Sequence, residues 1–336
     1  MRWTDACKRS PDDFGPDAVA RAVRSATRFV MRRLVGIDWR VVGDEHFYEK
    51  STTTAKKKKK KHDTTTTTKG AAGPSSVADP PAATSAFPRG AVGLVSPHGA
   101  YPLGAMFHGI PHFRCERPAL RLRVGAASVL FYVPVVREYL LLFGAREVTR
   151  ATIETLVDAG CCVACNPGGI VEMVHQRSDM EVVFVMPNLG LFKCAIRKRV
   201  PVVLMYGFGE AQTFTCHRRF EAARAKLAAL ARVGLPWISG RFGLSLGPVP
   251  VVPHPGTIVH VAASAGDGGV IPVDTWCDRL LEDESNLHEL AVSLFEVYKT
   301  NLTALFDRHK DAFLPPEVAK KGLTVVWLGH DPLPRD

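Results

Sequence analysis

The sequence predicts an α/β fold in a single domain, with a central mixed or mostly parallel sheet flanked by helices. The first observation behind this prediction is that strand-like apolar runs alternate with helical patterns along the chain after residue 90. The second is that polar turn residues follow the predicted strands, as they do at the ligand-binding edge of parallel sheets. The third is that 336 residues with 46% hydrophobic side chains suffice to bury a core.

The first predicted element is an amphipathic helix within residues 1–50. Between residues 17 and 36, apolar side chains share one helical face and arginines share another. The two sets are Val19, Val23, Ala26, Val30 and Leu34, and Arg21, Arg24, Arg28 and Arg32. A helix on an anionic membrane surface has this pattern, and so does a helix that packs on its own domain with an arginine-rich outer face. Both interpretations stay open. Elsewhere, no apolar run is long enough to predict a transmembrane helix.

Residues 51–90 are expected to form a disordered insertion rich in Lys, Thr, Pro and Ala. Six lysines at 56–61 supply six of the ten net positive charges, and threonine tracts flank them. Such a stretch cannot bury enough apolar surface to offset the entropy of ordering it. A nuclear-localisation or nucleic-acid patch is the alternative, but a solvated tract explains the charge and no nucleic-acid partner is predicted.

The predicted domain covers residues 91–325 and is followed by a tail at 326–336. Periodicity predicts strands and helices in alternation: strands at 91–95, 161–165 and 200–206, and helices at 149–159, 190–197, 221–232 and 287–313. A turn follows each of these strands, and a polar residue lies in the turn or shortly after it. Because the carboxyl ends of parallel strands meet at one edge, we expect His98, Glu172 and Glu210 to gather there.

Three of the eight cysteines, Cys161, Cys162 and Cys165, resemble half of a metal site. No matching Cys or His pair follows at zinc spacing, so no metal site is predicted. The segment instead reads as a buried strand in which free cysteines pack as small hydrophobic residues.

Gly243-Leu244-Ser245-Leu246-Gly247 matches the nucleophile elbow of α/β hydrolases. That elbow requires a helix directly after it, and Pro248, Pro250 and Pro253 prevent one here. We therefore reject the hydrolase interpretation.

His98 is the most informative residue of the sequence. The apolar run at 91–95 predicts a buried strand, and Pro97 with Gly99 ends it in a tight turn. An imidazole with an ordinary pKa of about 6.5 is mostly neutral near neutral pH and suits a general base. The alternative is a turn histidine bonded to its own backbone.

Five motifs in order resemble the diacylglycerol acyltransferase type 2 family. They are Ser96-Pro97-His98-Gly99, Phe131-Tyr132-Val133-Pro134 with Arg137, Pro167-Gly168-Gly169 with Glu172, the block from residue 190 that closes on Phe208-Gly209-Glu210, and Leu305-Phe306-Asp307-Arg308-His309-Lys310. The first is most similar to the plant-type form of the family motif. The resemblance covers residues 91–310.

The resemblance implies a glycerolipid-acyltransferase-like fold that transfers a fatty acyl group from acyl-CoA to diacylglycerol, giving triacylglycerol. It implies no cofactor beyond acyl-CoA as co-substrate, and a place on the cytosolic face of the endoplasmic reticulum membrane or on lipid droplets. A monoacylglycerol or wax-alcohol acyltransferase, or a non-catalytic lipid or acyl-CoA binder, are the alternatives. The oligomeric state is not predicted.

By the same resemblance, His98 is the catalytic base and Glu172 is the first candidate to orient its imidazole, with Glu210 second. Helix capping is the alternative role for Glu172. Pro97 and Gly99 flank the base. The backbone at Gly168 and Gly169 would bind the oxyanion or CoA phosphates. Four cations are further candidates for CoA phosphates, although solvated surface roles are equally open: Arg137, Arg150, Lys193 and Arg197.

An apolar groove for the acyl chain is expected from Phe131, Tyr132 and residues 140–143, or from the N-terminal helix. The chain also departs from the family. Ser96 replaces a His or Glu, and Leu103 stands where related glycerolipid acyltransferases place an Asp that orients the base. The family's hydrophobic N-terminal hairpin is not found in this sequence, as expected of a truncated gene model or a peripheral form.

Overall fold

The computed structural model describes residues 15–43, 87–231, 234, 236–243, 249–253, 255–262 and 265–334. The lysine and threonine tracts of the predicted insertion lie outside the described residues, as does Ser245 of the hydrolase-like motif. Phe87, near the end of the expected insertion, is buried in a turn that leads into the first strand of the domain. The folded domain therefore begins before residue 91.

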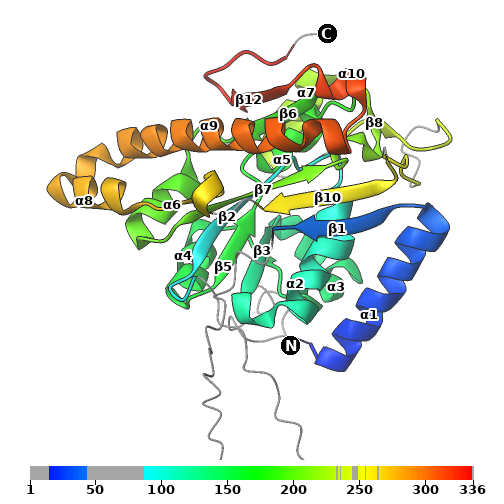
Figure 1. Cartoon of the computed structure of the whole chain (residues 1–336), viewed down its shortest axis with the longest axis horizontal. Coiled ribbons are helices and arrows are strands. Elements are labelled where there is room, and N and C mark those ends of the chain that lie inside the picture. The colour runs from blue at the N-terminus through cyan, green and yellow to red at the C-terminus, as the bar shows by residue number, and fades with distance from the viewer. Residues whose placement is uncertain are drawn as a thin grey trace, which may run out of the picture.

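A mostly parallel sheet forms the centre of the described structure (Figure 1). Its eight strands run in the order β1-β10-β7-β2-β5-β3-β4, with β11 paired to β7. Their bounds are β1 Asp38–Val42, β2 Ala91–Ser96, β3 Leu122–Ala126, β4 Arg146–Glu147, β5 Cys162–Cys165, β7 Val202–Phe208, β10 Thr257–Ala262 and β11 Val270–Ile271. From β7 to β4 all neighbours are parallel, whereas β10 and β11 run antiparallel to β7. The predicted α/β class is confirmed.

Helices cover both faces of this sheet (Figure 1). One face packs against α4 (Arg150–Asp158), α6 (Gly190–Lys198), α8 (Asp274–Glu282) and the long α9 (Leu287–Phe313). Strand residues alternate between faces, so Val92 and Leu94 of β2 enter this main core. The other face carries α2 (Ile110–Glu116), with α1 (Asp17–Phe29) and α3 (Val136–Leu142) beside it. Two small sheets pair β6 (Glu181–Val185) with β12 (Leu323–Trp327), and β8 (Thr215–Cys216) with β9 (Ile238–Ser239).

Local signals explain where the helices start and stop. The Thr149 hydroxyl caps α4 by accepting the Thr152 N–H at 3.2 Å, as expected at the start of that helix. The four predicted helices of the domain are confirmed as α4, α6, α7 (Glu221–Ala231) and α9. Two short helices complete the list, α5 (Gly169–His175) and α10 (Pro316–Ala319).

Cys161, Cys162 and Cys165 are buried at β5, as predicted for a strand. Burial raises the pKa of Cys162 and of Cys165 to about 12, so both remain thiols.

The N-terminal helix α1 packs on the domain along one side, and its contact with a membrane surface stays a prediction. Ala20 and Met31, on α1 and the π-helical turn that continues it, are buried against the domain. Much of the predicted apolar face nevertheless meets solvent, since Val19, Val30 and Leu34 are 48%, 43% and 70% exposed. Among the described residues, none of the helices combines the length and the apolar character needed to cross a membrane.

Candidate active site

β2 brings His98 to the carboxyl edge of the sheet. The strand ends at Ser96, the Ser96–Pro97 peptide is cis, and Gly99 follows the histidine with φ at +69°. A Cβ on Gly99 would lie 3.1 Å from the Glu210 carbonyl oxygen, so both the backbone angle and the space require glycine here. The chain therefore turns sharply at His98 and leaves its imidazole partly buried at this edge.

The hydrogen bond of the His98 ring defines its tautomer. Nδ1 lies 3.0 Å from the Gly99 carbonyl oxygen. A carbonyl oxygen can only accept, so Nδ1 carries the proton and Nε2 keeps its lone pair. Burial lowers the pKa of His98, although its hydrogen bond to Gly99 raises it in part. The bond to the backbone, foreseen as the alternative to catalysis, thus prepares Nε2 to accept a proton.

Glu172 contacts His98 through the backbone and not through the ring. Its Oε1 accepts the His98 backbone N–H at 2.6 Å. The carboxyl group is fully buried on α5, and burial raises the pKa of Glu172 to about 8 despite the N–H bond that lowers it. The expectation that Glu172 binds the imidazole is therefore wrong in its detail, because the ring is already held by Gly99.

Glu210, which follows β7, holds the other end of the same segment. Its two oxygens accept the Gly104 N–H at 2.9 and 3.1 Å. This carboxyl group is also buried, and burial raises the pKa of Glu210 to about 8. Glu172 and Glu210 thus fix the chain between His98 and Gly104 from both ends, which confirms that the three predicted residues gather at one edge.

A second buried histidine, His260 on β10, lies beside Glu210. The Trp39 Nε1–H donates to His260 Nδ1 at 2.6 Å, and His260 Nε2 lies 3.7 Å from Glu210 Oε2. Burial lowers the pKa of His260 to about 3, so this ring is neutral. Sequence reasoning missed His260, although its place in an apolar run is the same signal that drew attention to His98.

Glu181 on β6 is a further buried carboxylate that the sequence did not suggest. Tyr206 donates its hydroxyl proton to Glu181 Oε2 at 2.6 Å, and the Gln212 amide donates to Oε1 at 2.8 Å. Ser96 points into the main core, where its hydroxyl lies 3.2 Å from the Tyr298 hydroxyl. The position that holds a His or Glu in the family motif therefore contacts Tyr298 of the main core in this protein.

Gly168 and Gly169 have a packing role in this structure. A Cβ on Gly168 would lie 2.5 Å from Glu172 Oε2. Glycine at this position therefore leaves room for the Glu172 carboxyl group that binds the His98 N–H. The Gly169 N–H already donates to the Asn166 carbonyl oxygen at 3.2 Å. This bond argues against Gly169 as an oxyanion donor and leaves that role as a prediction for Gly168.

The four predicted cations do not form one cluster. Arg150 on α4 pairs with Glu154 at 2.8 Å, and Arg197 on α6 lies 4.0 Å from the same carboxylate. Lys193 is half-buried on α6. Arg137 pairs with Glu138 on α3 instead. Their contact with CoA phosphates stays a prediction, with the α4–α6 surface as its main location.

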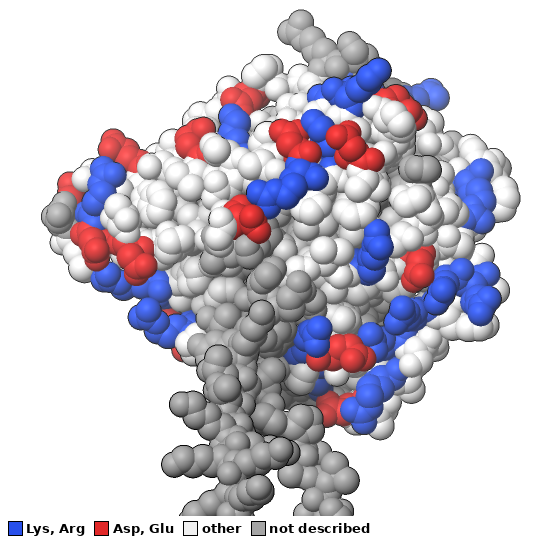
Figure 2. Space-filling view, viewed as in Figure 1, with Lys and Arg blue, Asp and Glu red and all other residues white. Residues whose placement is uncertain are grey.

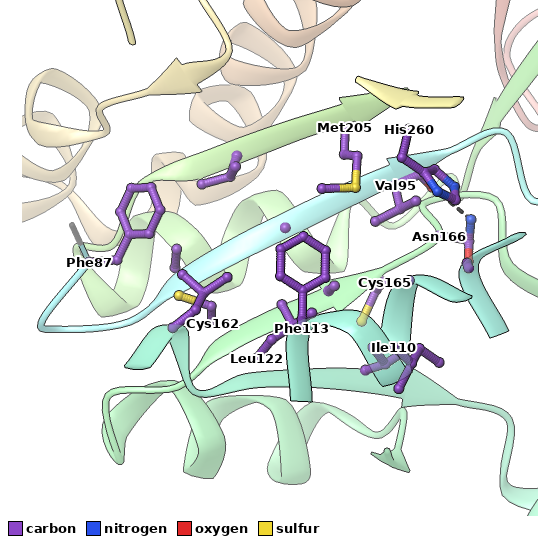
Figure 3. Close-up of a pocket in the computed structure, with 18 residues that line it drawn as sticks. Phe87, Val95, Ile110, Phe113, Leu122, Cys162, Cys165, Asn166, Met205 and His260 are labelled. Atoms are coloured by element: carbon purple, nitrogen blue, oxygen red, sulfur yellow. Dashed lines mark hydrogen bonds between the residues drawn. The ribbon is translucent and has the colours of Figure 1, made fainter. Parts of the chain in front are cut away.

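An elongated apolar cavity lies between the sheet and α2 (Figure 3). The space between protein atoms at this site is about 760 Å³, a value that includes open solvent at its mouth. The residues expected to form an acyl groove do not line this cavity: Phe131 is buried with Leu140 and Leu141 in a separate cluster, and Tyr132 is 64% exposed. The cavity lies along β2, the strand that leads into the turn with His98.

The two buried carboxyl groups predict that the protein loses stability as pH rises above about 6.5. Below that pH the buried histidines His98 and His260 act in the opposite direction, because their pKa values are lowered. The fold raises the pKa of Glu172 and of Glu210 from 4.5 to about 8, so the folded state holds their protons more tightly than the unfolded state. Their stabilisation is complete below pH 4.5 and is lost as pH rises towards 8, by about 1.4 kcal/mol per pH unit for each group. Urea unfolding at several pH values measures this slope. Glu172→Gln and Glu210→Gln should each flatten it, and an unchanged slope in both variants would contradict the assignment.

Comparisons with known proteins agree with this geometry. The family model described as diacylglycerol acyltransferase matches residues 91–321. The chain is 27% identical over 234 residues to mouse diacylglycerol O-acyltransferase 2-like protein 6, covering 65% of each chain. It is 24% identical to human diacylglycerol O-acyltransferase 2, covering 66% of this chain and 57% of that protein. For human 2-acylglycerol O-acyltransferase 3 the identity is 26%, with 64% of each chain covered.

The matched segments thus span less than two thirds of the length of these relatives. No solved structure matches the chain. The family model accounts for most of the sequence, including the turn at His98, Glu172 and Glu210. The chain belongs to the diacylglycerol acyltransferase family.

Proposed function

We propose that this protein is an acyl-CoA-dependent O-acyltransferase that acylates diacylglycerol to give triacylglycerol. The observation that carries the proposal is the His98 imidazole, whose Nδ1–H is bound to the Gly99 carbonyl and whose Nε2 is thereby left basic. The names of the relatives, which include diacylglycerol and 2-acylglycerol O-acyltransferases, support acyl transfer to an acylglycerol hydroxyl.

In the proposed reaction, the acyl group passes directly from the CoA thioester to the acceptor hydroxyl. Nε2 of His98 takes the proton of the acceptor hydroxyl while the hydroxyl oxygen attacks the thioester carbonyl carbon. The tetrahedral intermediate then collapses, the C–S bond breaks, and the Nε2 proton passes to the CoA thiolate. The products are the new ester and free CoA, and His98 returns to its starting tautomer. Glu172 and Glu210 act as positioning residues because each binds the backbone of the His98–Gly104 segment.

A membrane surface is the proposed place for this reaction, on the cytosolic face of the endoplasmic reticulum or on lipid droplets. Exposed apolar residues of α1 and the turn after it, among them Phe29 at 60% and Leu34 at 70%, lie next to exposed arginines. Figure 2 shows basic side chains along this part of the surface. An anionic lipid surface is complementary to both features.

The acceptor is tested with the full chain in liposomes, using labelled acyl-CoA and three acceptors: diacylglycerol, monoacylglycerol and a long-chain alcohol. We expect labelled triacylglycerol as the main product. Diacylglycerol formed from monoacylglycerol would favour the activity named in the 2-acylglycerol relative. A wax ester would indicate a wax-alcohol acyltransferase. Binding of acyl-CoA without any product would overturn the proposal in favour of a non-catalytic binder.

A further inference from the structure

The apolar cavity beside β2 exists because the strand residues facing it are small. Ala91, Gly93 and Val95 alternate with the core residues of β2 and point to the opposite face, and Ala164 of β5 lies next to them. A Cβ on Gly93 would lie only 3.3 Å from the Ala164 Cα, so a side chain at position 93 would be crowded. With hydrogen at Gly93 and methyl groups at Ala91 and Ala164, the space above the strands stays open. Ile110 and Phe113 of α2 form the opposite wall.

The two ends of the cavity differ in character (Figure 3). Phe87 stands at the start of β2 and bounds one end. Asn166 and His260 stand at the other end, where the Asn166 amide donates to the Val95 carbonyl oxygen at 2.7 Å. From Val95 the chain continues directly to His98, and Asn166 continues to Gly168. The polar end of the cavity is thus the end nearest the turn that carries His98.

We propose that this cavity binds the hydrocarbon chain of the acyl-CoA donor and that the aromatic ring of Phe87, at the far end, limits the length of that chain. This inference rests on the proposed acyltransferase function. The chain would lie along β2 with its thioester carbonyl beside His98 and its methyl end towards Phe87. The lining of the cavity provides the apolar surface that a hydrocarbon chain requires, and the neutral His260 ring adds no charge to it.

The length of the strand gives an estimate of the preferred chain. Ala91 and Val95 are about 13 Å apart at ~3.3 Å per strand residue, and the three residues to His98 add up to about 10 Å. An extended alkyl chain advances ~1.25 Å per carbon, from bonds of ~1.5 Å at ~111°, so about 10 carbons fit beside β2 and at most about 18 fit the whole span to His98.

The donor is the better occupant because it carries one chain attached to the carbonyl that reacts. Diacylglycerol carries two chains and presents a hydroxyl group. The cavity is a single layer between one sheet face and α2, with one polar end at the catalytic turn. It therefore suits one chain whose head group reacts at His98.

The test compares acyl-CoA donors from decanoyl to arachidoyl on the unchanged chain and two cavity variants. Ala164→Leu fills the middle of the cavity, and we expect the ratio of kcat/KM for stearoyl over decanoyl donors to fall at least about tenfold, as for a few misplaced methylenes in an apolar pocket. Phe87→Ala removes the ring that bounds the far end and should shift the preference to longer donors. The matched controls, Ala145→Leu and Phe192→Ala, change buried residues of other clusters and should leave the profile unchanged.

A second measurement uses the unmodified protein and does not depend on catalysis. An acyl-CoA with a photoreactive diazirine at its chain end should label the peptides that contain Phe87 or Phe113. Label confined to other peptides would overturn the inference, and so would an unchanged donor profile in both cavity variants. A change in preference for the chains of diacylglycerol, with the donor profile unchanged, would assign the cavity to the acceptor. Absence of transfer with every donor would instead overturn the proposed function, while the label would still decide what the cavity binds.

Discussion

Replacing His98 by Ala is expected to reduce acyl transfer to diacylglycerol by about 10²- to 10⁴-fold, the contribution typical of a general base. The side chain supplies the lone pair on Nε2, and the Gly99 carbonyl oxygen holds the ring in place through Nδ1. The loss should appear in kcat, because the imidazole acts on the proton that moves in the transition state. The measurement is the initial rate with labelled acyl-CoA at saturating acceptor.

The pH profile gives a second readout of the same prediction. Because burial lowers the pKa of His98, activity should persist into mildly acidic solution and fall only when the ring takes up a proton. His288→Ala is the matched control, since His288 is exposed at the start of α9. A His98→Ala protein that keeps the kcat of the parent would exclude His98 as the base.

Much of the fold could be predicted because it depends on local patterns. The helix α9 begins and ends within a residue or so of the predicted span, since leucines and aromatic residues recur at helical spacing over seven turns. The strands β6 and β10 were not predicted. The first residue of β6, Glu181, is a buried carboxylate, which its partners Tyr206 and Gln212 satisfy from far along the chain. Such compensation is invisible to a local pattern.

The candidate site was predicted at the level of the sheet edge but not at the level of atoms. Parallel strands bring His98, Glu172 and Glu210 to one edge whatever their side chains do. The contact that Glu172 makes depends on the turn at Gly99. This turn folds the backbone so that the His98 ring binds the Gly99 carbonyl and the His98 N–H faces Glu172. The cavity beside β2 was not predicted for a similar reason, because small residues on one sheet face create it, whereas the acyl groove was predicted from large apolar residues.

Replacing Glu172 by Leu is expected to lower kcat about 10²-fold, the loss that a displacement of about 1 Å can cause at a reacting centre. The leucine removes the acceptor of the His98 N–H, and an unsatisfied buried N–H group costs about 1–3 kcal/mol. The turn would then shift to find another partner and would carry the imidazole with it. Glu210→Leu should act in the same direction through the Gly104 N–H.

The amide variants separate positioning from proton transfer. Glu172→Gln keeps an oxygen that accepts the His98 N–H, and because burial raises the pKa of Glu172 to about 8, the native group is itself largely neutral at pH 7. We therefore expect Glu172→Gln to restore most of the kcat that Glu172→Leu loses, with the pH profile of the parent. A Gln variant as inactive as the Leu variant would show that the carboxyl proton takes part in the reaction. Since the backbone bond is the contact observed for this carboxyl group, rescue by the amide is the outcome that the geometry predicts.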